Sequence, residues 1–67
     1  MKQAGKEVIL AYADSNMNAY ETARRLYRSS NSVLYQLQKV KEETGLDPRN
    51  FHELVKLVEM VKGDGTV

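Results

Sequence analysis

The chain has 67 residues, enough for one small domain, because folding at this size removes only about 60% of the unfolded chain's surface from water. That fraction argues against a deep enzyme cleft with its own supporting shell. Hydrophobic residues make up 42% and charged residues 28% of the chain, which is ordinary for a globular domain and too apolar for a disordered one. Because there is no cysteine, a disulfide framework and a thiolate metal site are excluded.

Charged residues are unevenly distributed, although the net charge is only +1. Residues 1–21 sum to −1, residues 22–41 to +5 and residues 42–67 to −3. The central segment has no acidic residue, and its basic residues are Arg24, Arg25, Arg28, Lys39 and Lys41. Such a basic centre is expected where one face approaches phosphate. The alternative is a chance cluster on a solvated face.

The chain carries no recognisable targeting or membrane signal. Its early apolar run, residues 8–13, is too short for a secretory signal, and no stretch approaches the roughly 18 apolar residues of a membrane span. We therefore expect a cytoplasmic protein with no membrane partner and no small-molecule ligand domain. Residues 1–62 should form one domain, and residues 63–67 a flexible tail.

Two helices are predicted in the first half of the chain. Periodicity indicates the first from Lys2 to Ala13, ended by the polar residues 14–16. Its apolar stripe contains Ala4, Val8, Ala11 and Tyr12. Asn18 should cap a second helix of about eight residues, with Glu21 reaching back to the N–H of the cap. The buried stripe of that helix should be Ala19, Ala23, Leu26 and Tyr27.

The third predicted helix begins at Ser29 or Ser30, where either hydroxyl can cap it, and runs to Thr44 before Gly45. Its buried stripe is expected to contain Val33, Leu37, Val40 and Thr44. Helical geometry then places on the outward face of this helix the residues Asn31, Tyr35, Gln38, Lys39 and Glu42.

The fourth predicted helix opens at Asp47 and Pro48 and ends at Lys62 or Gly63. Its inner face is expected to comprise Phe51, Leu54, Val55, Val58 and Val61. Leu57 and Met60 lie off that face, one apolar strip more than a monomer needs. Together with Ile9 and Leu10 of the first helix, they are the candidate interface of a homodimer.

The second and third helices have the proportions of a DNA-binding helix-turn-helix, joined at residues 27–29. Ala23 of the second helix is small and stands where the third helix would cross it closely, and the Val33 side chain of the third helix would pack against the second. The sequence therefore predicts an all-α fold, a small four-helix domain that contains a helix-turn-helix.

Short polar side chains at the start of the third helix would let its backbone enter the major groove of double-stranded DNA. The candidate base contacts are Ser30, Asn31, Ser32, Tyr35 and Gln36, and Lys39 can reach bases or phosphates. The candidate phosphate anchors are Arg24, Arg25 and Arg28.

Residues 21–47 read ETARRLYRSSNSVLYQLQKVKEETGLD. This segment resembles the C-terminal helix-turn-helix domain of PucR-type regulators, the group that includes purine-catabolism and sugar-diacid activators, whose pattern runs ExAxxL, NTLxYRL and TGLD. The matching residues are Glu21, Ala23, Leu26, Asn31, Tyr35, Leu37, Thr44, Gly45, Leu46 and Asp47. The likeness covers about residues 16–62 and implies a DNA-binding transcriptional regulator.

Several positions depart from the family pattern. Ser29-Ser30 replaces a usual His-Arg pair, and Leu34, Gln36 and Gln38 stand where basic residues are common. The alternative function is therefore a protein-interaction module that keeps the regulator fold. Leu34 is either a thymine-methyl contact or part of a protein interface. Tyr35 contacts DNA or a partner, or else packs partly against the fourth helix.

No catalytic or metal-binding constellation is evident. His52 is the sole histidine and has no convergent ligands, and no nucleophile and base pair is identifiable. We therefore expect no enzyme activity, no cofactor and no metal. Tyr12, Tyr20 and Tyr27 are expected to wedge between helices rather than to stack on bases.

Overall fold

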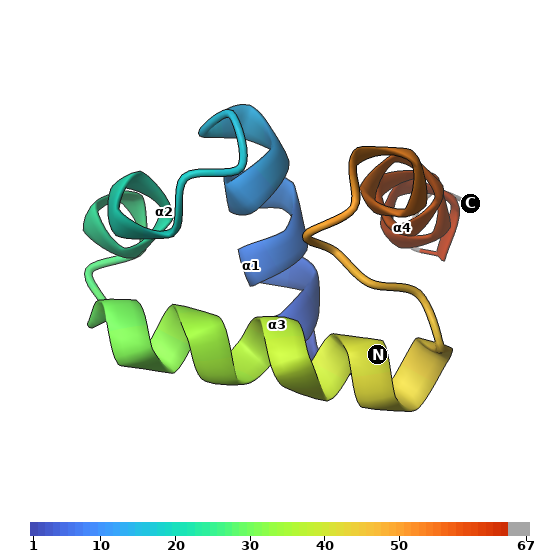
Figure 1. Cartoon of the computed structure of the whole chain (residues 1–67), viewed down its shortest axis with the longest axis horizontal. Coiled ribbons are helices and arrows are strands. Elements are labelled where there is room, and N and C mark those ends of the chain that lie inside the picture. The colour runs from blue at the N-terminus through green and yellow to red at the C-terminus, as the bar shows by residue number, and fades with distance from the viewer. Residues whose placement is uncertain (65–67) are drawn as a thin grey trace.

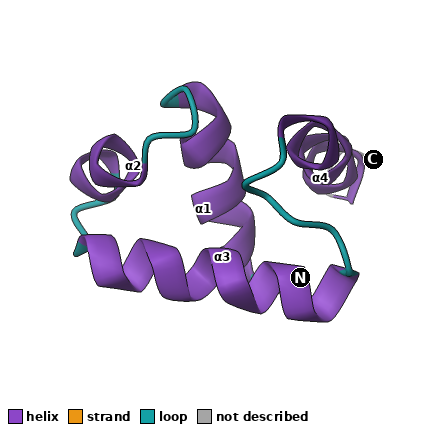
Figure 2. Ribbon diagram, in the orientation of Figure 1, coloured by secondary structure: helices purple, strands orange, loops and turns teal. Residues whose placement is uncertain are grey.

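The computed structural model describes residues 1–64, and within them it contains four helices and no strand. The helices are α1 (Gln3–Asp14), α2 (Ala19–Arg25), α3 (Ser30–Thr44) and α4 (Phe51–Asp64), joined by short loops (Figure 2). The predicted all-α fold with four helices is confirmed. No helix in the described part of the chain is long and apolar enough to cross a membrane.

Helix α1 is the centre of the fold (Figure 1). The helices α2, α3 and α4 all pack against it, and α2 and α3 also pack against each other. Helix α4 makes no helix-to-helix contact other than the one with α1. In Figure 1 α2 lies on one side of α1 and α4 on the other, and α3 runs across below α1 from the α2 side to the α4 side.

The core is built from one stripe of each long helix and from Ala23 of α2. Its buried residues are Val8, Ile9, Tyr12, Ala23, Val33, Leu37, Val40, Leu54, Leu57 and Val61. The predicted stripe of α3 is confirmed at Val33, Leu37 and Val40. Its last member, Thr44, is half-buried and donates its hydroxyl to the Val40 carbonyl at 2.7 Å.

The inner face of α4 differs from the prediction. Leu54 and Val61 are buried as expected, but Leu57 is fully buried, whereas Phe51 and Val55 are 62% and 42% exposed. The α4 helix is therefore rotated about its axis relative to the expected face, because α1 covers the Leu57 side.

This rotation also corrects the expected homodimer interface. Leu57 and Ile9 are both 0% exposed, and Leu10 packs against the core. Of that proposed strip only Met60, which is 48% exposed, remains an exposed residue. The interface predicted through Leu57 is wrong because its side chain is part of the monomer's own core.

The expectation for the tyrosines is confirmed at one position of three. Tyr12 is buried, but Tyr20 is 65% and Tyr27 97% exposed. Tyr27 has a φ of 55°, so the backbone has left the helix there and carries the side chain out of the predicted α2 stripe.

The predicted caps are confirmed at α2 and α3. Asn18 Oδ1 accepts the Glu21 N–H at 3.0 Å, Ser29 Oγ accepts the Ser32 N–H at 3.1 Å, and Gly45 ends α3 with a φ of 76°. The expected return contact from Glu21 is not formed, because its carboxylate pairs with Arg24 at 2.8 Å and the Asn18 N–H donates to the Ser15 carbonyl.

Helix α4 begins later than predicted. Asn50, not Asp47, is its cap, and Asn50 Oδ1 accepts the Glu53 N–H at 3.2 Å. Asp47 and Pro48 instead form a turn that precedes the helix, in which Asp47 Oδ1 accepts the Arg49 N–H at 3.0 Å. At its other end α4 continues through Asp64, and the rest of the predicted tail, residues 65–67, lies outside the described residues.

Candidate nucleic-acid interface

The turn between α2 and α3 is held by backbone hydrogen bonds and by a single left-handed residue. The Leu26 N–H donates to the Thr22 carbonyl at 3.1 Å, and the Arg28 N–H donates to the Ala23 carbonyl at 2.9 Å. Between them Tyr27 adopts the left-handed conformation, which few residues other than glycine visit without strain. The chain is thereby turned sharply from α2 into the Ser29 cap of α3.

The interior of the helix-turn-helix is as the sequence predicts. Ala23 is 4% and Val33 0% exposed, and both belong to the core. Sequence reasoning missed Thr22, which is fully buried and donates its hydroxyl to the Asn18 carbonyl at 2.8 Å. This hydrogen bond within the first turn of α2 satisfies the buried hydroxyl and supports a helix too short to persist alone.

The start of α3 carries three of the five predicted base-contacting residues on its first turn. Asn31 is exposed, and Ser30 and Ser32 are half-buried. No large apolar side chain precedes Val33 on this helix, so the first turn presents short polar groups and its own backbone. Entry into the major groove requires that the helix backbone can come close to the base edges.

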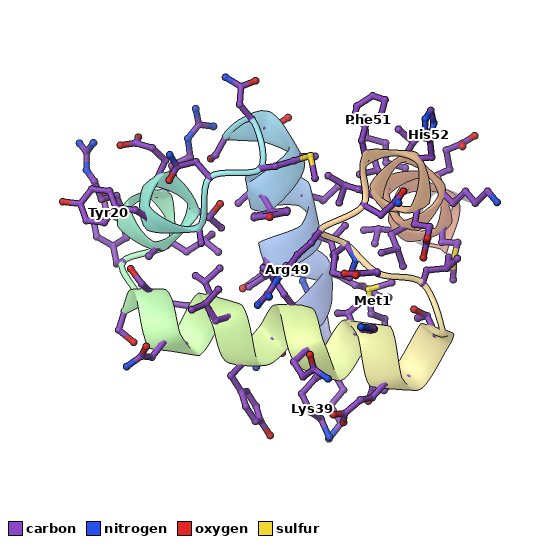
Figure 3. The ribbon with its side chains drawn as sticks, viewed as in Figure 1. Met1, Tyr20, Lys39, Arg49, Phe51 and His52 are labelled. Carbon is purple, nitrogen blue, oxygen red and sulfur yellow. The ribbon has the colours of Figure 1, made fainter. Side chains whose placement is uncertain are left out.

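The next turns of α3 carry Tyr35, Gln36 and Lys39. Tyr35 is 60% exposed and Gln36 and Lys39 are half-buried. Figure 3 shows Lys39 on the side of α3 that is turned away from α2 and α4. The alternative in which Tyr35 packs against the fourth helix is wrong, because α3 and α4 are not in contact. Leu34, at 38% exposure, is also at the surface.

The basic centre is partly neutralised by acidic residues from the flanking segments. Arg24 pairs with Glu21 at 2.8 Å, Arg28 with Glu7 of α1 at 3.4 Å, and Lys41 with Asp47 at 3.8 Å. Within residues 1–64, Arg25 and Lys39 belong to no ion pair. Ion pairs at a protein surface are worth only about 0–1 kcal/mol, so a phosphate group can replace the carboxylate partner.

The pair between Arg28 and Glu7 was not predicted. It joins the helix-turn-helix turn to α1 across 21 residues of sequence, a separation that no helical spacing rule covers. It places Glu7, a competing anion, beside one of the three predicted phosphate anchors.

Histidine and carboxylate groups do not gather elsewhere in the described part of the chain. No group of three or more His, Cys, Asp or Glu residues there could hold a metal ion. The exposed His52 ring packs edge-on against Phe51, with centroids 5.5 Å apart (Figure 3).

The order of the four helices, the sharp turn at Tyr27 and the polar start of α3 agree with comparison to known families. The family model of the PucR C-terminal helix-turn-helix domain matches residues 6–61, which run from α1 to α4. The chain belongs to this family. Helix-turn-helix regulator domains of this kind bind DNA and are not enzymes. No curated protein and no solved structure matches the chain.

Proposed function

We propose that this PucR-type domain binds double-stranded DNA as a small transcriptional regulator, with the start of α3 in the major groove. The observation that carries the proposal is the first turn of α3. Asn31 is exposed there beside two half-buried serines, while Val33 on the opposite side is fully buried against the rest of the domain. The buried side of this turn is thus fixed by packing, and its exposed side is polar.

The side chains divide into two roles under this proposal. Arg24, Arg25 and Arg28 bind backbone phosphates and set the orientation of α3. Base edges are read by Ser30, Asn31, Ser32, Tyr35 and Gln36. Lys39, on the later part of α3, binds a fourth phosphate. Arg25 needs no rearrangement for this role, whereas Arg24 and Arg28 must exchange a carboxylate for a phosphate.

The test is titration of the protein with mixed-sequence duplex DNA over a range of salt concentrations. Four neutralised phosphates give a slope of log affinity against log salt of about −3.6. Absence of binding at low salt, or binding that does not change with salt, would contradict the proposal. That result would favour a protein-interaction module, for which the exposed Leu34 and Tyr35 supply a surface.

Two variants separate the proposed roles. Arg25→Ala should weaken binding to all sequences by a similar factor and make the salt slope shallower by about 0.9. Asn31→Ala should reduce the preference among sequences, at a cost of about 1–3 kcal/mol for the best site. If Arg25→Ala changed the sequence preference and Asn31→Ala did not, the assignment of roles would be reversed.

The size of the domain bears on how many copies bind. Its principal extents are 29 × 23 × 20 Å, less than the roughly 34 Å between equivalent major-groove sites one turn apart. One copy therefore reaches one half-site, and we propose that two copies occupy neighbouring half-sites. In sedimentation the measured mass of the protein should rise with protein concentration towards that of a dimer. A monomer mass at all concentrations would contradict this point.

A further inference from the structure

A hollow of about 250 Å³ lies between the start of α1 and the middle of α3. Its lining residues are Lys2, Ala4, Gly5, Tyr35, Gln36, Lys39 and Glu43. Three of these, Tyr35, Gln36 and Lys39, belong to the proposed DNA-binding surface. The hollow therefore continues that surface from α3 onto α1, and the residue it adds at the rim is Lys2, which is exposed.

The close approach of the two helices depends on Gly5. A Cβ atom at this position would lie 3.1 Å from Val40 Cγ2, tighter than ordinary van der Waals contact, and 3.4 Å from Met1 Cγ. Because glycine has no side chain, the first turn of α1 reaches α3, and Lys2 is brought to the same hollow as Lys39. Lys2 comes from a segment whose net charge is −1, so the charge distribution along the sequence does not indicate that Lys2 lies near Lys39.

A helix in the major groove has a phosphate backbone on each side, and cations that bind both backbones fix its orientation. Helix α2, which carries Arg24 and Arg25, packs against α3. The hollow with Lys39 and Lys2 is lined by the start of α1 and the middle of α3, and no residue of α2 lines it. Neither lysine forms an ion pair within residues 1–64, so both charges are available to an anion.

We propose that Lys2 is a fifth phosphate-binding residue, which acts with Lys39 on the strand opposite to the one held by α2. This proposal rests on the proposed function of α3. The one carboxylate lining the hollow, Glu43, opposes a phosphate there, and its removal should strengthen binding. The wild-type salt slope should then be about −4.5 rather than about −3.6.

The experiment compares Lys2→Ala with Lys56→Ala, Lys2→Arg and Glu43→Gln in titrations with mixed-sequence duplex DNA. Lys2→Ala should weaken binding about tenfold at about 50 mM salt and return the slope to about −3.6. Lys56→Ala removes an equal charge from an exposed position of α4, a helix that does not contact α3, and should leave affinity and slope unchanged. Lys2→Arg should match the wild type, and Glu43→Gln should bind more tightly.

The possible failures are distinguishable. If the wild-type protein does not bind DNA, the proposed function fails and this inference fails with it. If the wild type binds but Lys2→Ala equals it in affinity and slope, only the inference is overturned. It is also overturned if Lys2→Ala and Lys56→Ala weaken binding equally, because net charge alone would then explain the loss. Thermal unfolding of each variant confirms that the fold is retained.

Discussion

Tyr27 sets the helix-turn-helix turn through its backbone rather than its ring. The side chain is 97% exposed, so packing cannot explain its φ of 55°. The conformation is imposed by the hydrogen bonds that flank it. They end α2, and in one of them the backbone N–H of Arg28 donates to the Ala23 carbonyl. A residue with a Cβ pays about 1–2 kcal/mol for this conformation, which glycine adopts readily.

We therefore expect Tyr27→Gly to raise the free energy of unfolding by up to about 1 kcal/mol, because the strain it relieves exceeds the entropy it adds to the unfolded chain. Urea denaturation is the measurement. Tyr20→Gly is the matched control, since Tyr20 is also exposed but lies within α2, where glycine lowers stability by up to about 1 kcal/mol. Equal destabilisation by both variants would contradict the account.

The titration of Tyr12 is linked to folding. Burial raises the pKa of its phenol, while Arg49 lowers it and Asp47 raises it by smaller amounts. The folded protein thus holds the phenolic proton more tightly than the unfolded chain. The stability that this contributes is fully present below the unfolded pKa of about 10, and it is lost as the pH rises through that value towards the folded one.

Tyr12→Phe should consequently lose less stability than the wild type between about pH 8 and about pH 11. Urea denaturation of both proteins at the two pH values gives the comparison. An equal loss in both would show that Tyr12 is not the responsible group.

At the scale of elements, α4 shows why an apolar pattern alone does not determine the buried face of a helix. Residues 51–61 contain more apolar positions than one face needs, and two stripes at helical spacing can be drawn through them. The stripe that contains Leu54, Leu57 and Val61 is buried because α4 packs on α1 alone. Phe51 and Val55 are left to line an apolar hollow of about 460 Å³ with Met17 of the loop between α1 and α2.

The rotation of α4 predicts an order of mutational effects opposite to the one that the sequence suggests. Leu57→Ala should lower the free energy of unfolding by about 2–5 kcal/mol because it opens a cavity in the core. Phe51→Ala should change it by less than about 1 kcal/mol because most of its ring is already in water. Thermal or urea unfolding of the two variants decides the matter, and the reverse order would place Phe51 in the core.

At the scale of the whole molecule, charge is arranged so that the domain is nearly neutral and yet one surface stays basic. Acidic residues from outside the central segment, Glu7, Glu21 and Asp47, each pair with one of its cations. These pairs are exposed, so they contribute little to stability. They reduce the positive potential that DNA would meet at the turn and at the end of α3.

Removal of the Glu7 carboxylate should therefore strengthen DNA binding, because Arg28 no longer needs to exchange it for a phosphate. We expect Glu7→Gln to raise affinity by up to about tenfold at low salt and to change stability by less than about 1 kcal/mol. Glu59→Gln, on the exposed surface of α4, adds the same charge far from the turn and is the control. Equal gains from both would mean that net charge alone matters.

Local signals in the sequence were sufficient for the helix-turn-helix itself. The caps at Asn18 and Ser29, the left-handed Gly45 and the α3 stripe all depend on residues within about four positions of one another, so helical geometry determines them. The residues at which the DNA is expected to bind follow from the same short-range pattern and from the family resemblance in residues 21–47.

Other features depended on which segments meet, and only the tertiary structure decided them. These features are the buried side of α4, the exposure of Tyr20, the pair between Arg28 and Glu7, and the approach of Lys2 to Lys39. Each depends on contact, or lack of contact, between groups far apart in the chain. Burial and long-range pairing are set by how whole helices pack, and several packings satisfy one apolar period. By itself the sequence determined the helices and the turn, whereas the packing on α1 decided which of their faces meet solvent.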